Sequence, residues 1–272
     1  MCRPLGISST MIGPDLTGEK LEQAVRRGIT HIEVLLAAAA QDAQDANAAQ
    51  LHNDLSAVGM TAWSVHAPFG GEVDLSAPDE LQRRASVGEM RRACEVADTL
   101  EAKCVVVHAG LLAEDEAECA LRRCQSLRSI NCLLKRTSRL GLRLAIEYLP
   151  ANKPRICNHS SMMLEVLNIV DGEAGVCLDT NHANLRESLA EAMLALADHI
   201  VTVHISDNDG EQERHMLPGE GVIDWPEFMR LLDEIGYDGP LMMEAGCQAE
   251  LPERLDLTVK SAREYLGWEA PE

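Results

Sequence analysis

The chain has 272 residues, 46% of them hydrophobic, and its 44 acidic and 24 basic residues give a formal net charge of −20. No apolar run reaches the roughly 18 residues that a transmembrane helix needs, which argues against a membrane protein. So acidic a chain repels phosphate backbones, which disfavours nucleic acid as a partner.

Short apolar runs alternate with longer amphipathic stretches along the whole chain, without a linker or a change in composition. Runs such as Cys104-Val-Val-Val107 are apolar on both faces, as buried parallel strands are. The runs predict eight strands, at residues 5–9, 31–36, 62–66, 104–108, 142–148, 174–179, 200–205 and 240–244.

Amphipathic helices are predicted between these strands. Residues 21–29 place apolar side chains on one helical face, and residues 228–235 do the same behind a capping box at Asp224 with Pro226 in the first turn. Further segments have helical composition, at residues 83–100, 117–140, 160–171, 187–199 and 254–267.

Eight strand–helix units predict either a closed barrel or a doubly wound sheet. A dinucleotide-binding sheet would carry a GxGxxG motif after its first strand, and this chain reads Ser8-Ser-Thr-Met-Ile-Gly13 there. We therefore expect an α/β protein whose residues 1–272 form a single (β/α)8 TIM-barrel domain.

Ionisable residues stand at the ends of six consecutive predicted strands. In a parallel barrel, the carboxyl ends of all strands meet at one mouth, where barrel enzymes keep their chemistry. Imidazoles and carboxylates gathered there would repel one another or lack partners without a cation, which favours a metal site over isolated, backbone-satisfied residues. The six are His66, His108, Glu147, Asp179, His204 and Glu244.

Two more polar features belong to the predicted mouth. His182 follows Asp179 by three residues, a spacing that lets its imidazole line the pocket. The long polar segment after the seventh predicted strand, residues 206–221, is costly to order unless it covers something. We expect this loop to lie over the mouth.

The order of these motifs resembles the xylose isomerase-like TIM-barrel superfamily, which includes sugar phosphate isomerases and epimerases, ketose 3-epimerases, inosose-processing enzymes and the family-2 AP endonucleases. The resemblance covers essentially the whole chain. It rests on His66-Ala-Pro, His108, Ile-Glu147, Leu-Asp179-Thr-Asn-His182, His204-Ile-Ser-Asp207, Pro-Gly-Glu-Gly-Val-Ile-Asp224-Trp225 and Met-Glu244.

This resemblance implies one divalent metal ion, held by Glu147, Asp179, His204 and Glu244. Three carboxylates and one imidazole suit Mn²⁺, Mg²⁺ or Co²⁺, with Zn²⁺ also tolerated. It also implies a carbohydrate isomerase or epimerase, in which Glu147 and Glu244 move a proton next to a carbonyl through an enediolate. The residues assigned to the substrate are His66, His108, His182, Arg214, His215 and Phe69.

Endonuclease IV, a multi-zinc phosphoesterase of the same superfamily, is the alternative. The net charge of −20 and the lack of basic loops between the strands argue against it. Another metal-dependent hydrolase or lyase on a sugar-like substrate also stays open, whereas the complete ligand set disfavours a scaffold without chemistry. The residues that match the three-zinc cluster of endonuclease IV are His66, His108, Glu147, Asp179, His182, His204, His215 and Glu244. Endonuclease IV has an Asp where this chain has Glu213.

The substrate and the assembly are less defined. Lys153 and Arg155 are the only basic residues near the predicted mouth besides Arg214, which favours an unphosphorylated sugar, keto-sugar or inosose. The sequence does not distinguish proton transfer from a hydride shift. Without a signal-peptide core, a cytoplasmic protein is expected. The oligomeric state stays open, although the resemblance is in keeping with a homodimer or homotetramer.

Overall fold

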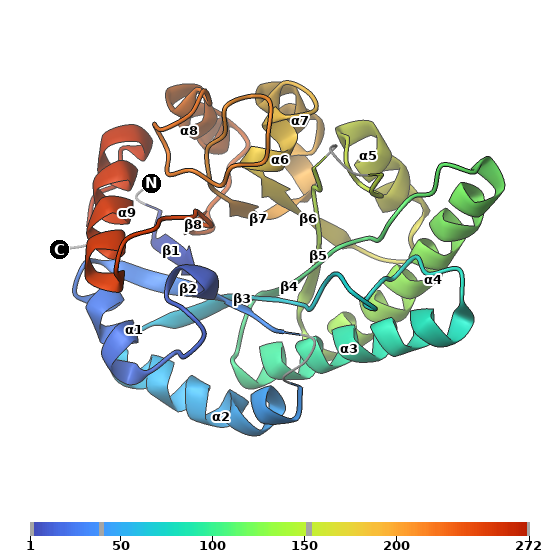
Figure 1. The fold of residues 1–272 in the computed structure, drawn as a ribbon, viewed down its shortest axis with the longest axis horizontal. Helices are drawn as coiled ribbons and strands as arrows, with labels where there is room; N and C mark the ends of the chain where they lie inside the picture. Colours follow the sequence, from blue (N-terminus) through green and yellow to red (C-terminus); the bar gives the residue numbers. More distant parts are fainter. Residues whose placement is uncertain (1–2, 38–40, 151–153, 271–272) are drawn as a thin grey trace.

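Eight parallel strands form one sheet in the computed structural model, which describes residues 3–37, 41–150 and 154–270. Hydrogen-bonded neighbours run in the order β7-β6-β5-β4-β3-β2-β1-β8. A parallel bridge between Ile205 and Met243 joins the two edges, so the sheet forms a nearly closed barrel (Figure 1). The strands are β1 (Leu5–Ser8), β2 (Ile29–Leu35), β3 (Thr61–His66), β4 (Cys104–Val107), β5 (Arg143–Glu147), β6 (Ala174–Asp179), β7 (Ile200–His204) and β8 (Leu241–Met243).

Helices surround the strands as an outer ring (Figure 1). Two short 3-10 helices, η1 (Ser9–Met11) and η2 (Ala197–His199), complete the described secondary structure. None of the helices in the described part of the chain combines the length and the hydrophobicity that a membrane crossing demands. The α-helices are α1 (Gly18–Val25), α2 (Gln41–Val58), α3 (Glu80–Thr99), α4 (Glu116–Leu140), α5 (Ser160–Ile169), α6 (Thr180–Asn184), α7 (Leu189–Ala195), α8 (Trp225–Glu234) and α9 (Leu251–Leu266).

The TIM barrel and its eight strands are confirmed, and one predicted helix is wrong at its end. Helix α1 stops at Val25, and Ile29 begins β2. The chain turns between them at Gly28, whose φ of 86° a side chain would strain. Helix α2 lacks a clear apolar stripe in the sequence and went unpredicted, as did the single turn of α6.

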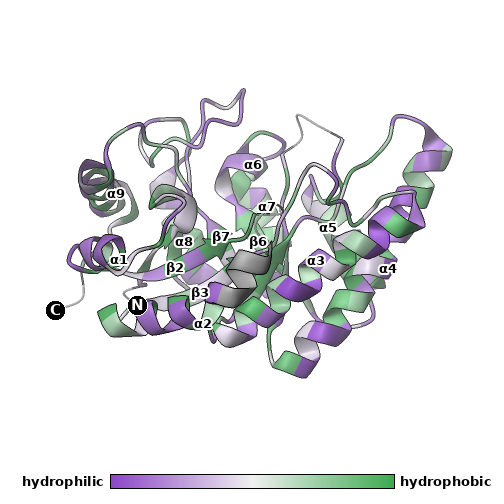
Figure 2. Ribbon diagram, turned by 60° about the horizontal axis from the view of Figure 1, so that its bottom comes forward, coloured by the Kyte–Doolittle hydropathy of each residue, from purple (hydrophilic) through white to green (hydrophobic). Residues whose placement is uncertain are grey.

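The hydrophobic core has two parts. Large aliphatic side chains fill the space between strands and helices, and Figure 2 shows hydrophobic residues on the strands and on parts of the surrounding helices. Small residues fill a separate cluster comprising Cys104, Val106, Ala145, Cys177 and Val201. Such close packing makes the barrel a rigid support for side chains at the strand ends.

A glycine beside the mouth gives a testable consequence of this packing. Gly110 has a φ of 121°, and a Cβ there would lie 2.4 Å from the Ser76 hydroxyl oxygen. We expect Gly110→Ala to lower the free energy of unfolding by about 1–3 kcal/mol in urea denaturation. Gly88→Ala is the control, because Gly88 lies in α3 with open space around its Cβ position. That variant should be neutral or more stable, and equal losses in both would contradict the steric argument.

Candidate functional site

The barrel brings the six strand-end residues to one mouth. His66, Glu147, Asp179 and His204 are the last residues of β3, β5, β6 and β7. His108 and Glu244 follow β4 and β8 by one residue. Because all strands are parallel, these side chains emerge at the same end of the barrel.

His204 stands at the centre of the four residues assigned to the metal. Its Nδ1 atom lies 3.0 Å from Glu244 Oε2, 3.8 Å from Glu147 Oε1 and 3.8 Å from Asp179 Oδ2. The side chains of His204, Asp179 and Glu147 are almost completely buried, and that of Glu244 is 21% exposed. Three carboxylates from three strands thus face one imidazole nitrogen.

Two atoms of this group lack a hydrogen-bond partner although they are buried. They are His204 Nδ1 and Asp179 Oδ2, and both face the space between the carboxylates. An unpaired buried polar atom is costly, and a cation would satisfy both atoms at once. The donor set of three carboxylates and one imidazole is also one that divalent ions accept. The residues present therefore fit a divalent metal ion.

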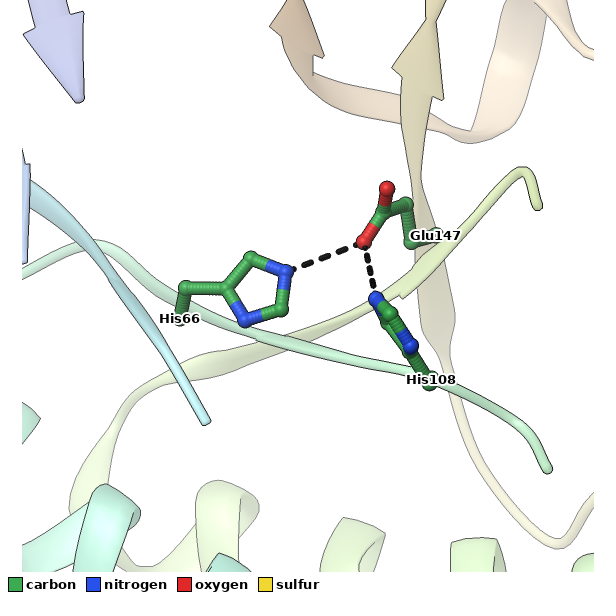
Figure 3. A group of neighbouring side chains, drawn as sticks. All are labelled: His66, His108 and Glu147. Atoms are coloured by element: carbon green, nitrogen blue, oxygen red, sulfur yellow. Dashed lines mark hydrogen bonds and ion pairs between the residues drawn. The ribbon is translucent and has the colours of Figure 1, made fainter. Parts of the chain in front are cut away.

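Glu147 also binds two histidines on its other oxygen. Figure 3 shows His66 and His108 directed at Glu147 Oε2, with Nε2–oxygen distances of 3.0 and 2.8 Å. His66 Nδ1 lies 2.8 Å from the carbonyl oxygen of Ala67. This second contact fixes the His66 ring with Nε2 facing the site.

The loop between β7 and α8 returns over the mouth. His182 Nε2 lies 3.5 Å from Glu213 Oε1, and His215 Nε2 lies 3.2 Å from the same oxygen. His215 Nδ1 lies 3.1 Å from the carbonyl oxygen of Glu244. The expected covering role of this loop therefore matches its position.

The remaining residues assigned to the substrate, Phe69 and Arg214, are more exposed than the buried cluster. Phe69 is 47% exposed and stacks on His108 with ring centroids 4.3 Å apart. Arg214 forms an ion pair with Asp209 at 2.8 Å, its side chain is 48% exposed, and no contact joins it to the cluster within the described ranges. Lys153 falls outside the described residues.

Electrostatics keep the two glutamates ionised. Burial alone would raise the pKa of Glu147, but His108 and further imidazoles outweigh it and hold that pKa well below its usual range. Burial would also raise the pKa of Glu244, but the neighbouring His204 outweighs burial and lowers the pKa of Glu244 to about 2. Burial raises the pKa of Asp179. Asp179 is therefore the carboxylate most in need of added positive charge.

Two buried carboxylates were assigned no role from the sequence: Glu33, which was not named, and Asp207, which was named only as part of a motif. Glu33 on β2 lies 2.9 Å from His204 Nε2, across the barrel. Its signal was an acid inside an apolar strand, Ile32-Glu-Val34. Asp207 is a buried residue of the covering loop and accepts hydrogen bonds from four backbone N–H groups and from the Trp225 indole.

Comparison with known proteins agrees with this architecture. The family model of the xylose isomerase-like TIM barrel matches residues 21–266. The chain belongs to this family. Its fold is thus that of a xylose isomerase-like barrel.

Individual xylose isomerase-like relatives are distant in sequence. An uncharacterised protein of Methanocaldococcus jannaschii is 29% identical over 66% of this chain and 63% of its own length. A ketose 3-epimerase of Arthrobacter globiformis is 28% identical over 75% of this chain and 68% of its own length. The crystal structure of a D-tagatose 3-epimerase-like protein has a TM-score of 0.84 and 23% identity, and the match covers 98% of both chains. This last likeness shows the fold.

Proposed function

We propose that this chain is a divalent-metal-dependent isomerase or epimerase of carbohydrates. The observation that carries the proposal is the group around His204 Nδ1, in which Glu147, Asp179 and Glu244 converge from three strands. The ketose 3-epimerase among the relatives supports the class of substrate. We place the metal ion between these four residues.

Glu147 and Glu244 are the proposed proton-transfer groups. Both belong to the mouth and lie near His204 Nδ1, where a carboxylate can accept a proton and a carboxylic acid can donate one. One, as a carboxylate, would remove the proton next to the substrate carbonyl and become a carboxylic acid. The other, after taking a proton from solvent, would donate it to the resulting enediolate and return to the carboxylate. A bound divalent ion supplies positive charge that stabilises negative charge on the carbonyl oxygen.

His66, His108, His182 and His215 are proposed to bind substrate oxygens, because their rings border the same mouth. Phe69 is proposed to pack on the apolar face of a sugar ring. Arg214 would have to leave Asp209 to reach a substrate. It is the weakest member of the assigned set.

Proton exchange with solvent tests the reaction. The protein would be incubated with ketoses such as fructose and tagatose in D₂O, and the products would be followed by proton NMR. We expect an epimer or isomer that carries deuterium at the reacting carbon. A product without deuterium would point to a hydride shift, and no turnover across the ketose and inosose series would overturn the proposed reaction.

Removal of the metal is expected to lower stability as well as activity. Because the ion binds the folded state, it adds about 2.7 kcal/mol when its free concentration is one hundred times its Kd. We therefore expect EDTA treatment to lower Tm and abolish turnover, and added Mn²⁺ to restore both. An unchanged Tm and activity after EDTA, with metal loss verified by elemental analysis, would contradict a metal-dependent enzyme.

A multi-zinc phosphoesterase is the second candidate, and two further donor groups favour it. His66, His108 and Glu147 form one group, and His182, Glu213 and His215 form another, each with three donor atoms within 4.8 Å of one another. The metal content of protein purified without chelator distinguishes the two reactions. About one ion per chain supports the epimerase, and close to three zinc ions per chain support the phosphoesterase.

A further inference from the structure

Glu33 holds the central histidine from the side opposite the mouth. Its Oε1 and Oε2 atoms lie 2.9 and 3.1 Å from His204 Nε2. Oε2 also accepts a 2.7 Å hydrogen bond from the Ser64 hydroxyl. Glu33, Ser64 and His204 are all 0% exposed, so water does not compete for these contacts.

This contact determines which imidazole nitrogen carries the proton. A carboxylate only accepts, so His204 Nε2 must be the N–H that donates to Glu33. In the neutral ring, Nδ1 then has a lone pair, and that atom faces Glu244, Glu147 and Asp179. A lone pair among carboxylate oxygens is stable only next to a cation.

We propose that Glu33 is a positioning residue that keeps His204 in its Nε2–H tautomer and presents Nδ1 to the metal ion. The inference rests on the proposed metal site and goes beyond it, because Glu33 touches neither the ion nor the substrate. Its negative charge acts on the ion through the imidazole ring and makes the ring a better donor. Ser64 orients the carboxylate by occupying one of its oxygens.

The test is the Mn²⁺ affinity of Glu33→Gln, measured by isothermal titration calorimetry on metal-free protein. A glutamine has the same shape and lacks the charge. We expect Kd to rise about 10- to 100-fold. Nitrogen-15 NMR of the Mg²⁺-saturated proteins, with histidine labelled, should show His204 with a proton on Nε2 and none on Nδ1 in the wild type, and loss of the protected Nε2–H signal in Glu33→Gln.

Asp74→Asn is the matched control, because Asp74 is another buried carboxylate, paired with Arg122 at 2.9 Å and with Ser76. It should lose stability without a change in Mn²⁺ affinity. An unchanged Kd in Glu33→Gln, or equal losses in both variants, would overturn the role of Glu33. A wild type that binds Mn²⁺ but turns over no carbohydrate would overturn the proposed reaction and leave this role standing. A wild type without Mn²⁺ binding would overturn both.

Discussion

Glu244→Gln is expected to lower kcat for the proposed isomerase or epimerase reaction by about 10²- to 10⁴-fold, the range that general acid–base catalysis contributes. Glutamine keeps the size of the side chain, but its amide cannot accept and return a proton near neutral pH. Glu244 follows β8 at the rim and is 21% exposed, so the substitution leaves the core unchanged. The measurement is kcat of the metal-saturated variant, with Tm recorded in parallel.

Glu211→Gln is the control for Glu244→Gln. Glu211 is exposed in the loop between β7 and α8, so the change removes one negative charge from the same region without touching the mouth. We expect its kcat to stay within about twofold of the wild type, because exposed charges are screened. Near wild-type activity in Glu244→Gln would remove Glu244 from the mechanism.

Asp207→Ala is expected to destabilise the covering loop more than any other single change in it. Oδ2 accepts from Gly219 N, Gly221 N and Trp225 Nε1 at 2.9–3.1 Å, and Oδ1 accepts from Asn208 N and Ile223 N. Removing the carboxylate leaves these donors unpaired, at about 1–3 kcal/mol for each buried group that water cannot reach.

The total loss in Asp207→Ala is expected to reach about 3–5 kcal/mol, as for other broken buried charge networks. Hydrogen exchange measured by mass spectrometry should show residues 216–224 losing protection. Asp224→Ala is the control from the same loop, since Asp224 caps α8 by accepting one exposed hydrogen bond from the backbone N–H of Glu227. It should cost about 1 kcal/mol. Similar losses in the two variants would contradict a special role for Asp207.

The strand positions and the polar mouth could be predicted from the sequence because both depend on local patterns. An apolar run such as Cys104–Val107 is buried on both faces wherever it lies in a parallel barrel. A residue that ends such a run, as Asp179 ends β6, reaches the mouth because every strand points the same way. Chain order and hydrophobic pattern were sufficient for this much.

The pairing of polar groups depended on the closed barrel and could not be read from residue order. Glu33 meets His204 only because β2 and β7 face each other across the barrel interior, 171 residues apart in the chain. The five donors of Asp207 come together only when the loop folds back on itself. The partner of Arg214 is local instead, because Asp209 lies only five residues away in the chain. This ion pair holds the guanidinium that was assigned to the substrate.

The sequence by itself thus determined the barrel and the six polar residues at its mouth, since periodicity and strand direction are properties of the chain. Only the tertiary structure decided which nitrogen of His204 faces the carboxylates, and which of its neighbours lie unpaired around that atom. The physical reason is that hydrogen bonds and ion pairs act over about 3 Å. Contacts that short are set by how strands close into a barrel, which residue order alone does not specify.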